Sequence, residues 1–126
     1  MKRFWAAAVL LALLLSLSLL HSQIIHAFTE QLTLRLTHAR ELAQEGHWEQ
    51  AQDLTAQVFF QWQDRHFYLH STMRHADTDE ILRKFRAVSQ HLELRDPEQY
   101  AAANTDLIQL LQLLAEMEQP SLVNIL

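Results

Sequence analysis

The sequence predicts an all-α protein in which an N-terminal transmembrane helix continues into an antiparallel bundle of about four helices. The 126 residues include one glycine and two prolines, which leaves little material for turns. Ala, Leu, Gln and Glu are abundant, and these residues favour helices. An uncharged apolar run of seventeen residues follows Lys2 and Arg3. Because there is no cysteine, disulfides and thiolate metal sites are excluded.

Residues 1–28 form the predicted membrane anchor. The apolar run after Arg3 continues through Ile25 and reaches the length of about 20 residues that a transmembrane helix needs. We therefore expect residues 4–28 to cross the lipid bilayer as an uncleaved signal-anchor. The alternatives are a cleaved signal peptide, for which a good cleavage site is missing after the run, and a buried helix of a soluble protein.

The formal charges are distributed unevenly along the chain. Lys2 and Arg3 are the only charged residues before Phe28, whereas residues 29–126 carry eight Lys or Arg against fifteen Asp or Glu, a net charge of −7. Positively charged flanks stay in the cytoplasm, so we expect a single-pass protein of the cell membrane with residues 29–126 as an extracytoplasmic domain. An acidic domain repels phosphates, and we expect no nucleic acid partner.

The membrane helix is expected to continue beyond the bilayer as one rod over residues 4–45, about 60 Å long at 1.5 Å per residue. Apolar residues recur on one face at three- and four-residue spacing, as they do on a helix. Gly46 is expected to end the rod, because a helix C-terminus favours a residue that tolerates positive φ. The apolar face consists of Ile25, Phe28, Leu32, Leu36, Ala39 and Ala43.

The second helix is predicted from His47 to about Ser71, and it is apolar on two sides. Such a helix is usually packed on both sides, so we expect it at the centre of the bundle. The first strip consists of Trp48, Ala51, Thr55, Val58, Trp62 and Leu69, and the second of Ala56, Phe60 and Phe67.

The third and fourth helices have clear start signals. Asp77 is expected to cap the third helix, with Glu80 at the capping-box position. Asp96 followed by Pro97 marks the start of the fourth helix. Pro120 is expected to end it, and the short apolar tail that follows is expected to pack on the bundle. The apolar faces are Ile81, Phe85, Val88 and Leu92 on the third helix, and Tyr100, Ala103, Leu107, Leu110, Leu111 and Leu114 on the fourth.

Four residues are candidates for a metal or ligand site: His66, His70, His75 and Asp79. His66 and His70 lie four residues apart on one helix face, a spacing that can chelate a divalent ion. The alternative interpretation gives the four residues structural roles, as buried rings or helix-end hydrogen-bonding groups, and we favour it. We therefore predict no cofactor and no metal.

No nucleophile–base pair and no glycine-rich phosphate loop accompanies the acidic residues near the start of the third helix, so we predict that the protein is not an enzyme. Half of the basic residues, Arg74, Arg83, Lys84, Arg86 and Arg95, lie within one short region. This region fits an acidic partner, lipid headgroups or a solvated helix face, and we favour the solvated face.

Several short motifs occur in a characteristic order along the chain. They are Lys2-Arg3 before the apolar anchor, Trp48-Glu49-x-Ala51, Trp62, His75-x-Asp77-x-Asp79-x-Ile81, and Pro120-Ser121-Leu122-x-Asn124-Ile125-Leu126. In this order the chain resembles a family of small bacterial membrane proteins, the domain of unknown function DUF4363. Thr78 stands where an apolar residue is expected. The resemblance implies a single-pass protein with a helical extracytoplasmic domain, and it supplies no activity.

The sequence thus predicts a non-enzymatic helical module that binds or stabilises another protein of the membrane or envelope. The alternative is an ectodomain that senses a ligand or a metal through His66, His70, His75 and Asp79.

Overall fold

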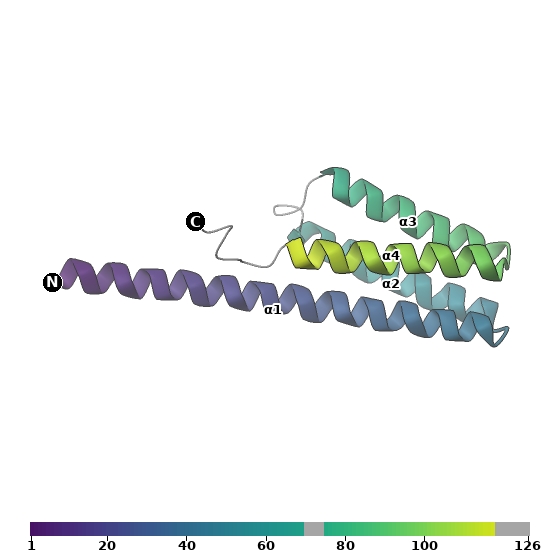
Figure 1. The fold of residues 1–126 in the computed structure, drawn as a ribbon, viewed down its shortest axis with the longest axis horizontal. Helices are drawn as coiled ribbons and strands as arrows, with labels where there is room; N and C mark the ends of the chain where they lie inside the picture. Colours follow the sequence, from purple (N-terminus) through teal and green to yellow (C-terminus); the bar gives the residue numbers. More distant parts are fainter. Residues whose placement is uncertain (70–74, 118–126) are drawn as a thin grey trace.

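The computed structural model describes residues 1–69 and 75–117, without the side chains of residues 66–69 and 75–77. Within these ranges the chain forms four helices and no strand. Successive helices are antiparallel, and each packs against two others in the cyclic order α1, α2, α3, α4 (Figure 1). The predicted all-α bundle is therefore confirmed. The helices are α1 (Lys2–Gln44), α2 (Trp48–Leu69), α3 (His75–Glu93) and α4 (Pro97–Met117).

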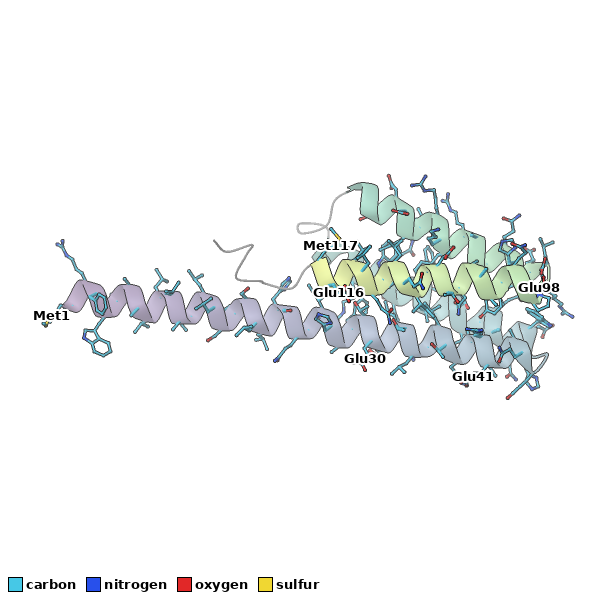
Figure 2. All side chains as sticks on the ribbon, viewed as in Figure 1. Met1, Glu30, Glu41, Glu98, Glu116 and Met117 are labelled. Carbon is cyan, nitrogen blue, oxygen red and sulfur yellow. The ribbon has the colours of Figure 1, made fainter. Side chains whose placement is uncertain are left out.

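α1 is a single helix of 43 residues, about 65 Å long at 1.5 Å per residue. Its N-terminal half extends beyond the bundle, and its side chains there have no neighbouring helix (Figure 2). None of the residues in its most apolar stretch is buried, and the helix is long and apolar enough to cross a membrane. In the C-terminal half, buried residues recur at three- or four-residue spacing from Ser22 and Ile25 to Ala43, with the partly buried Phe28 between Ile25 and Leu32.

The turn between α1 and α2 is built around Gly46, which has a φ of 86°. The N–H groups of Gly46 and His47 donate to the carbonyl oxygens of Ala43 and Leu42 at 3.0 and 2.8 Å, which closes the end of α1. The turn between α3 and α4 uses the same pair of hydrogen bonds, with Arg95 in the position of the glycine.

The core of the bundle is filled by apolar side chains from all four helices. Phe59 of α2 meets the ring of Phe85 of α3 edge-on, and Trp62 lies tilted against the same ring, with centroids 5.2 and 5.9 Å from that of Phe85. Ala51 and Val58 of the predicted α2 strip are completely buried. The buried core residues are Leu32, Leu36, Ala39, Ala43, Ala51, Val58, Trp62, Ile81, Phe85, Val88, Leu92, Tyr100, Leu107, Leu111 and Leu114.

The predicted central position of α2 is wrong. Ala56 and Phe60, which belong to its second apolar strip, are exposed, and 62% of the Phe60 surface is accessible. The cyclic arrangement gives each helix one inward face, so that Ala56 and Phe60 have no helix to pack against within the described part of the chain. Phe67 of this strip and Leu69 of the first lie outside the described side chains.

α3 begins at His75, two residues before the predicted cap Asp77. Asp77 therefore lies in the first turn of the helix, although its side chain is outside the described part of the chain. Glu80 is exposed, whereas Thr78, which stands at the position expected to be apolar, is buried. A capping preference is worth only about 1 kcal/mol, so it does not by itself prevent a helix from starting earlier.

α4 starts as its sequence indicates. Pro97 is its first residue, and the Gln99 N–H donates to Oδ1 of Asp96 at 3.2 Å. Trp48 meets the ring of Tyr100 edge-on, with centroids 6.2 Å apart, which joins the start of α2 to the start of α4. α4 ends at Met117, and the expectations about Pro120 and the apolar tail fall outside the described residues.

The interface between α1 and α4 contains one polar residue that the sequence did not reveal. Asn104 is completely buried, and its Nδ2 donates to the carbonyl oxygen of Leu36 at 3.1 Å. Its Oδ1 has no hydrogen-bond partner in the described part of the chain. This hydrogen bond fixes the position of α1 along its axis relative to α4.

Candidate functional site

The predicted histidine site lies mostly outside the described side chains, because those of His66, His70 and His75 are not part of them. Asp79 is exposed on α3 and shares a shallow depression with Leu82, Arg83 and Arg86. Among the described residues, no group of three or more His, Asp or Glu side chains is arranged to hold a metal ion. The metal interpretation of the three histidines stays a prediction.

The described residues of the basic region lie on α3 and in the turn after it, and Arg74 is outside the described residues. Arg83, Arg86 and Arg95 are exposed, while Lys84 lies 3.8 Å from the carboxylate of Asp106 on α4. Such an exposed ion pair is worth about 0–1 kcal/mol. The geometry of the described side chains agrees with the solvated face that the sequence favoured.

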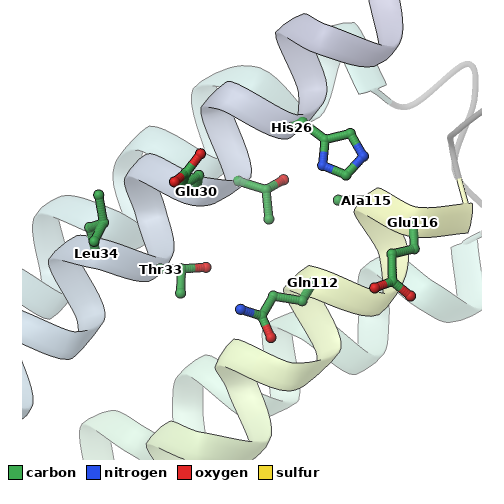
Figure 3. A pocket seen from close by; sticks show the side chains of 8 residues that line it. His26, Glu30, Thr33, Leu34, Gln112, Ala115 and Glu116 are labelled. Atoms are coloured by element: carbon green, nitrogen blue, oxygen red, sulfur yellow. The ribbon is translucent and has the colours of Figure 1, made fainter.

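A groove lies between α1 and α4 at the end of the bundle next to the exposed half of α1 (Figure 3). We call it the α1–α4 groove. Its volume of about 530 Å³ falls within the range of about 300–1,000 Å³ that is typical of ligand pockets. It is lined by His26, Thr29, Glu30, Thr33 and Leu34 of α1 and by Gln112, Ala115 and Glu116 of α4.

The helical repeat brings these side chains together. The α1 residues follow one another at spacings of three, one, three and one, which places them on one face of the helix beside the buried apolar strip. On α4, Gln112 and Glu116 are one turn apart and flank the small, buried Ala115. Because α1 and α4 are antiparallel, Glu116 lies near the His26 end and Gln112 near the Thr33 end (Figure 3).

Two polar atoms of residues that line the groove are inaccessible to solvent and have no hydrogen-bond partner within the described part of the chain. They are Nε2 of His26 and Oγ1 of Thr33. A buried polar group without a partner costs about 1–3 kcal/mol. The side chains of Glu30 and Glu116 are exposed, and there is no Lys or Arg among the described residues that line the groove. The mouth of the groove is therefore acidic, and the two unpaired atoms lie beneath its surface.

The sequence interpretation did not find this groove. His26 was assigned to the anchor, and the helix after it was analysed for its apolar face alone. The available signal was a polar strip at helical spacing next to that face, running from His26 through Thr29 to Thr33. The contribution of α4 depends on a contact between the first and the last helix, which no local pattern reveals.

The fold defines a class of all-helical proteins in which a long apolar helix continues into a four-helix bundle. A family model described as a domain of unknown function, DUF4363, matches residues 19–125. Because this match covers most of the chain, the protein belongs to the DUF4363 family, as the sequence motifs indicated. No curated protein and no solved structure matches the chain.

Proposed function

We propose that the protein is a membrane-anchored, non-enzymatic helical module that binds or stabilises another protein of the membrane or envelope. The observation that carries this proposal is the exposed apolar half of α1. Every large apolar side chain from Phe4 to Leu20 is exposed to more than 40%. Burial of apolar surface is worth about 25 cal/mol per Å², and soluble monomers rarely expose such a continuous patch. A lipid bilayer provides the cover that this stretch needs.

The continuity of α1 supports a fixed position of the bundle above the membrane. Ile25 is buried with Ala115 of α4, so the bundle begins where the apolar stretch ends. Two contacts hold α2 to the same part of α1. Arg65 lies over the ring of Phe28 at 4.8 Å, and Nη1 of Arg35 donates to Oε1 of Gln61 at 2.9 Å. A bundle held in this way offers a partner a surface of defined height and orientation.

The orientation is proposed from Lys2 and Arg3, which favour a cytoplasmic N-terminus and an extracytoplasmic bundle. Cysteine labelling tests it, because the natural chain has no cysteine and serves as a blank. Gln50→Cys places a thiol on the exposed surface of the bundle. A membrane-impermeant maleimide should label this variant in intact cells. Labelling only after permeabilisation contradicts the proposed orientation, and release of the chain by alkaline carbonate contradicts the anchor.

Partner binding is tested by photo-crosslinking in intact membranes. A photoreactive amino acid at the outward-facing Phe60 is expected to give a discrete adduct of reproducible mass. The same amino acid at Gln50, at the end of the bundle far from the membrane, is the matched control position. A chain that stays monomeric and gives no reproducible adduct from any exposed face contradicts the proposed module.

A further inference from the structure

We propose that the apolar residues 122–126, which follow α4, bind the lipid surface next to the point where α1 leaves the bilayer. The bundle then contacts the membrane at two places, through α1 and through the end of α4. This inference rests on the proposed membrane anchor, and its test separates a failure of the anchor from a failure of the lipid contact.

Two independent contacts give the same register between α1 and α4. Nδ2 of Asn104 donates to the carbonyl oxygen of Leu36, and Ala115 is buried together with Ile25. From the first contact to the second, α4 advances by eleven residues and α1 goes back by eleven. Because both helices rise by the same distance per residue, the last residue of α4, Met117, lies level with Gln23 of α1.

Gln23 lies at the expected edge of the hydrocarbon layer. Lys2 and Arg3 stay outside this layer, and Phe4 follows at the interface, where aromatic rings are favoured. Counted from Phe4, the roughly 20 residues that cross about 30 Å of hydrocarbon end near Gln23. Residues 21–23 are also the first run of consecutive polar residues after Arg3. The end of α4, which lies beside α1 where the exposed half begins, therefore reaches the membrane surface (Figure 1).

The apolar residues at this end of the bundle fit lipid as their partner. Leu113 and Met117 lie one turn apart on α4, and 52% and 56% of their surfaces are accessible. Four residues separate Met117 from the apolar segment, a distance of at most about 14 Å in an extended chain. Apolar side chains that begin at this height are stabilised by entering the bilayer. The segment contains Leu122, Val123, Ile125 and Leu126.

The depth of this contact is limited to the interface. Five residues are too few to cross the hydrocarbon layer, and a backbone outside a helix needs water or headgroups as hydrogen-bond partners. The exposed Glu116 at the end of α4 also keeps that end among the headgroups. Residues 29–126 carry a net charge of −7, so we expect a zwitterionic lipid surface to be preferred over an anionic one.

Depth is measured on the full chain in phosphatidylcholine vesicles, with single-cysteine variants that carry a fluorophore, because the natural chain has no cysteine. Val123→Cys reports on the apolar segment, Met117→Cys on the end of α4 and Gln23→Cys on the matched height of α1. Brominated acyl chains quench labels in lipid, and iodide on both sides of the membrane quenches labels in water. We expect lipid quenching at position 123 and equal depths at positions 117 and 23.

Two further labels separate the possible failures. Leu13→Cys reports on the centre of the proposed anchor, and Gln50→Cys on the exposed far end of the bundle. Absence of lipid quenching at position 13 contradicts the anchor, and the lipid contact fails with it. If position 13 is quenched by lipid while position 123 is quenched by iodide, the segment faces water. If position 123 is quenched by neither, the segment packs on the bundle. Either of these results overturns the proposal and leaves the anchor intact.

A matched pair of double variants tests whether the apolar side chains cause the contact. Leu122→Gln with Leu126→Gln makes the segment polar, and Leu34→Gln with Leu94→Gln makes the same change at exposed leucines of the bundle. The first pair should reduce lipid quenching at position 123 at least about fivefold, because two apolar side chains no longer favour lipid. The second pair should leave it unchanged. An equal reduction by both pairs, or none by the first, overturns the proposal.

Discussion

Replacing Arg95 by glycine is expected to stabilise the protein, and replacing Gly46 by alanine to destabilise it. Both residues occupy the same place in turns that close at the same end of the bundle, with φ of 53° and 86°. In the second turn, the N–H groups of Arg95 and Asp96 donate to the carbonyl oxygens of Leu92 and His91 at 3.1 Å each. One turn therefore has the residue that its backbone favours, and the other does not.

The magnitude follows from two opposing effects. A residue with a Cβ in the left-handed region costs about 1–2 kcal/mol relative to its ordinary conformation. Glycine gives back about 0.4–1 kcal/mol because it is more flexible in the unfolded chain. The difference is a gain of about 1 kcal/mol for Arg95→Gly and a loss of similar size for Gly46→Ala. Steric clash adds nothing to the loss, since a Cβ at Gly46 has no heavy atom within 4 Å.

Thermal unfolding of the full chain in mild detergent, followed by circular dichroism, measures both effects. In a bundle of this size, a change of 1 kcal/mol shifts Tm by about 4–8 °C. Arg95→Ala is the control, because it removes the guanidinium group and keeps a Cβ at positive φ. Its free energy of unfolding should stay within about 0.5 kcal/mol of the natural chain. If Arg95→Gly and Arg95→Ala have the same stability, the backbone explanation is refuted.

Three further predictions concern single buried or capping groups. Burial raises the pKa of Tyr100 to about 12, against the opposing effect of Arg40. Because this value lies above the ordinary 10.0 of the unfolded chain, stability is complete below about pH 10 and falls by up to about 3 kcal/mol as the pH rises towards 12. Tyr100→Phe should abolish this alkaline loss in urea unfolding, and persistence of the loss would assign it to other groups. Asn104→Leu should keep the free energy of unfolding within about 1 kcal/mol of the natural chain. Asn104→Asp should lower it by about 3 kcal/mol or more, because it buries a carboxylate against the Leu36 carbonyl oxygen. Equal stability of the two variants would contradict this explanation. Asp96→Ala should lower the free energy of unfolding by about 1 kcal/mol through loss of the helix cap, while Asp96→Asn retains the cap. An Asn variant as unstable as the Ala variant would show that the cap is not the cause.

The sequence predicted the features of the fold that depend on neighbouring residues. Helical spacing identified the buried face of α1, of which Leu36 and Ala39 are completely inaccessible. Gly46 was identified from its tolerance of positive φ, and Asp96 with Pro97 from the preferences of a helix start. Such signals act within one or two turns, so they can be recognised without knowledge of the fold.

The position of α2 was not predictable in this way. An apolar strip shows which residues favour burial, but it does not show whether another helix is available to cover them. More than half of the surface of a folded protein is apolar in any case. Phe60 illustrates the difference, since it lies opposite the buried strip of α2 and faces solvent. Only the cyclic packing of the four helices decides which of the two strips is covered.

The α1–α4 groove was missed for a related reason. Its two walls, at His26–Leu34 and Gln112–Glu116, are separated by almost the whole bundle in sequence. Neither wall is unusual alone, because Thr, Gln and Glu are common on exposed helix faces. The groove exists only because α1 and α4 pack side by side, and this depends on tertiary packing.

The contact between α1 and α4 matters for the proposed module in physical terms. It closes the ring of four helices, and it joins the last helix to the helix that carries the exposed apolar stretch. A partner that binds only the closed bundle stabilises this contact by mass action. At a free concentration one hundred times its Kd, this effect reaches about 2.7 kcal/mol.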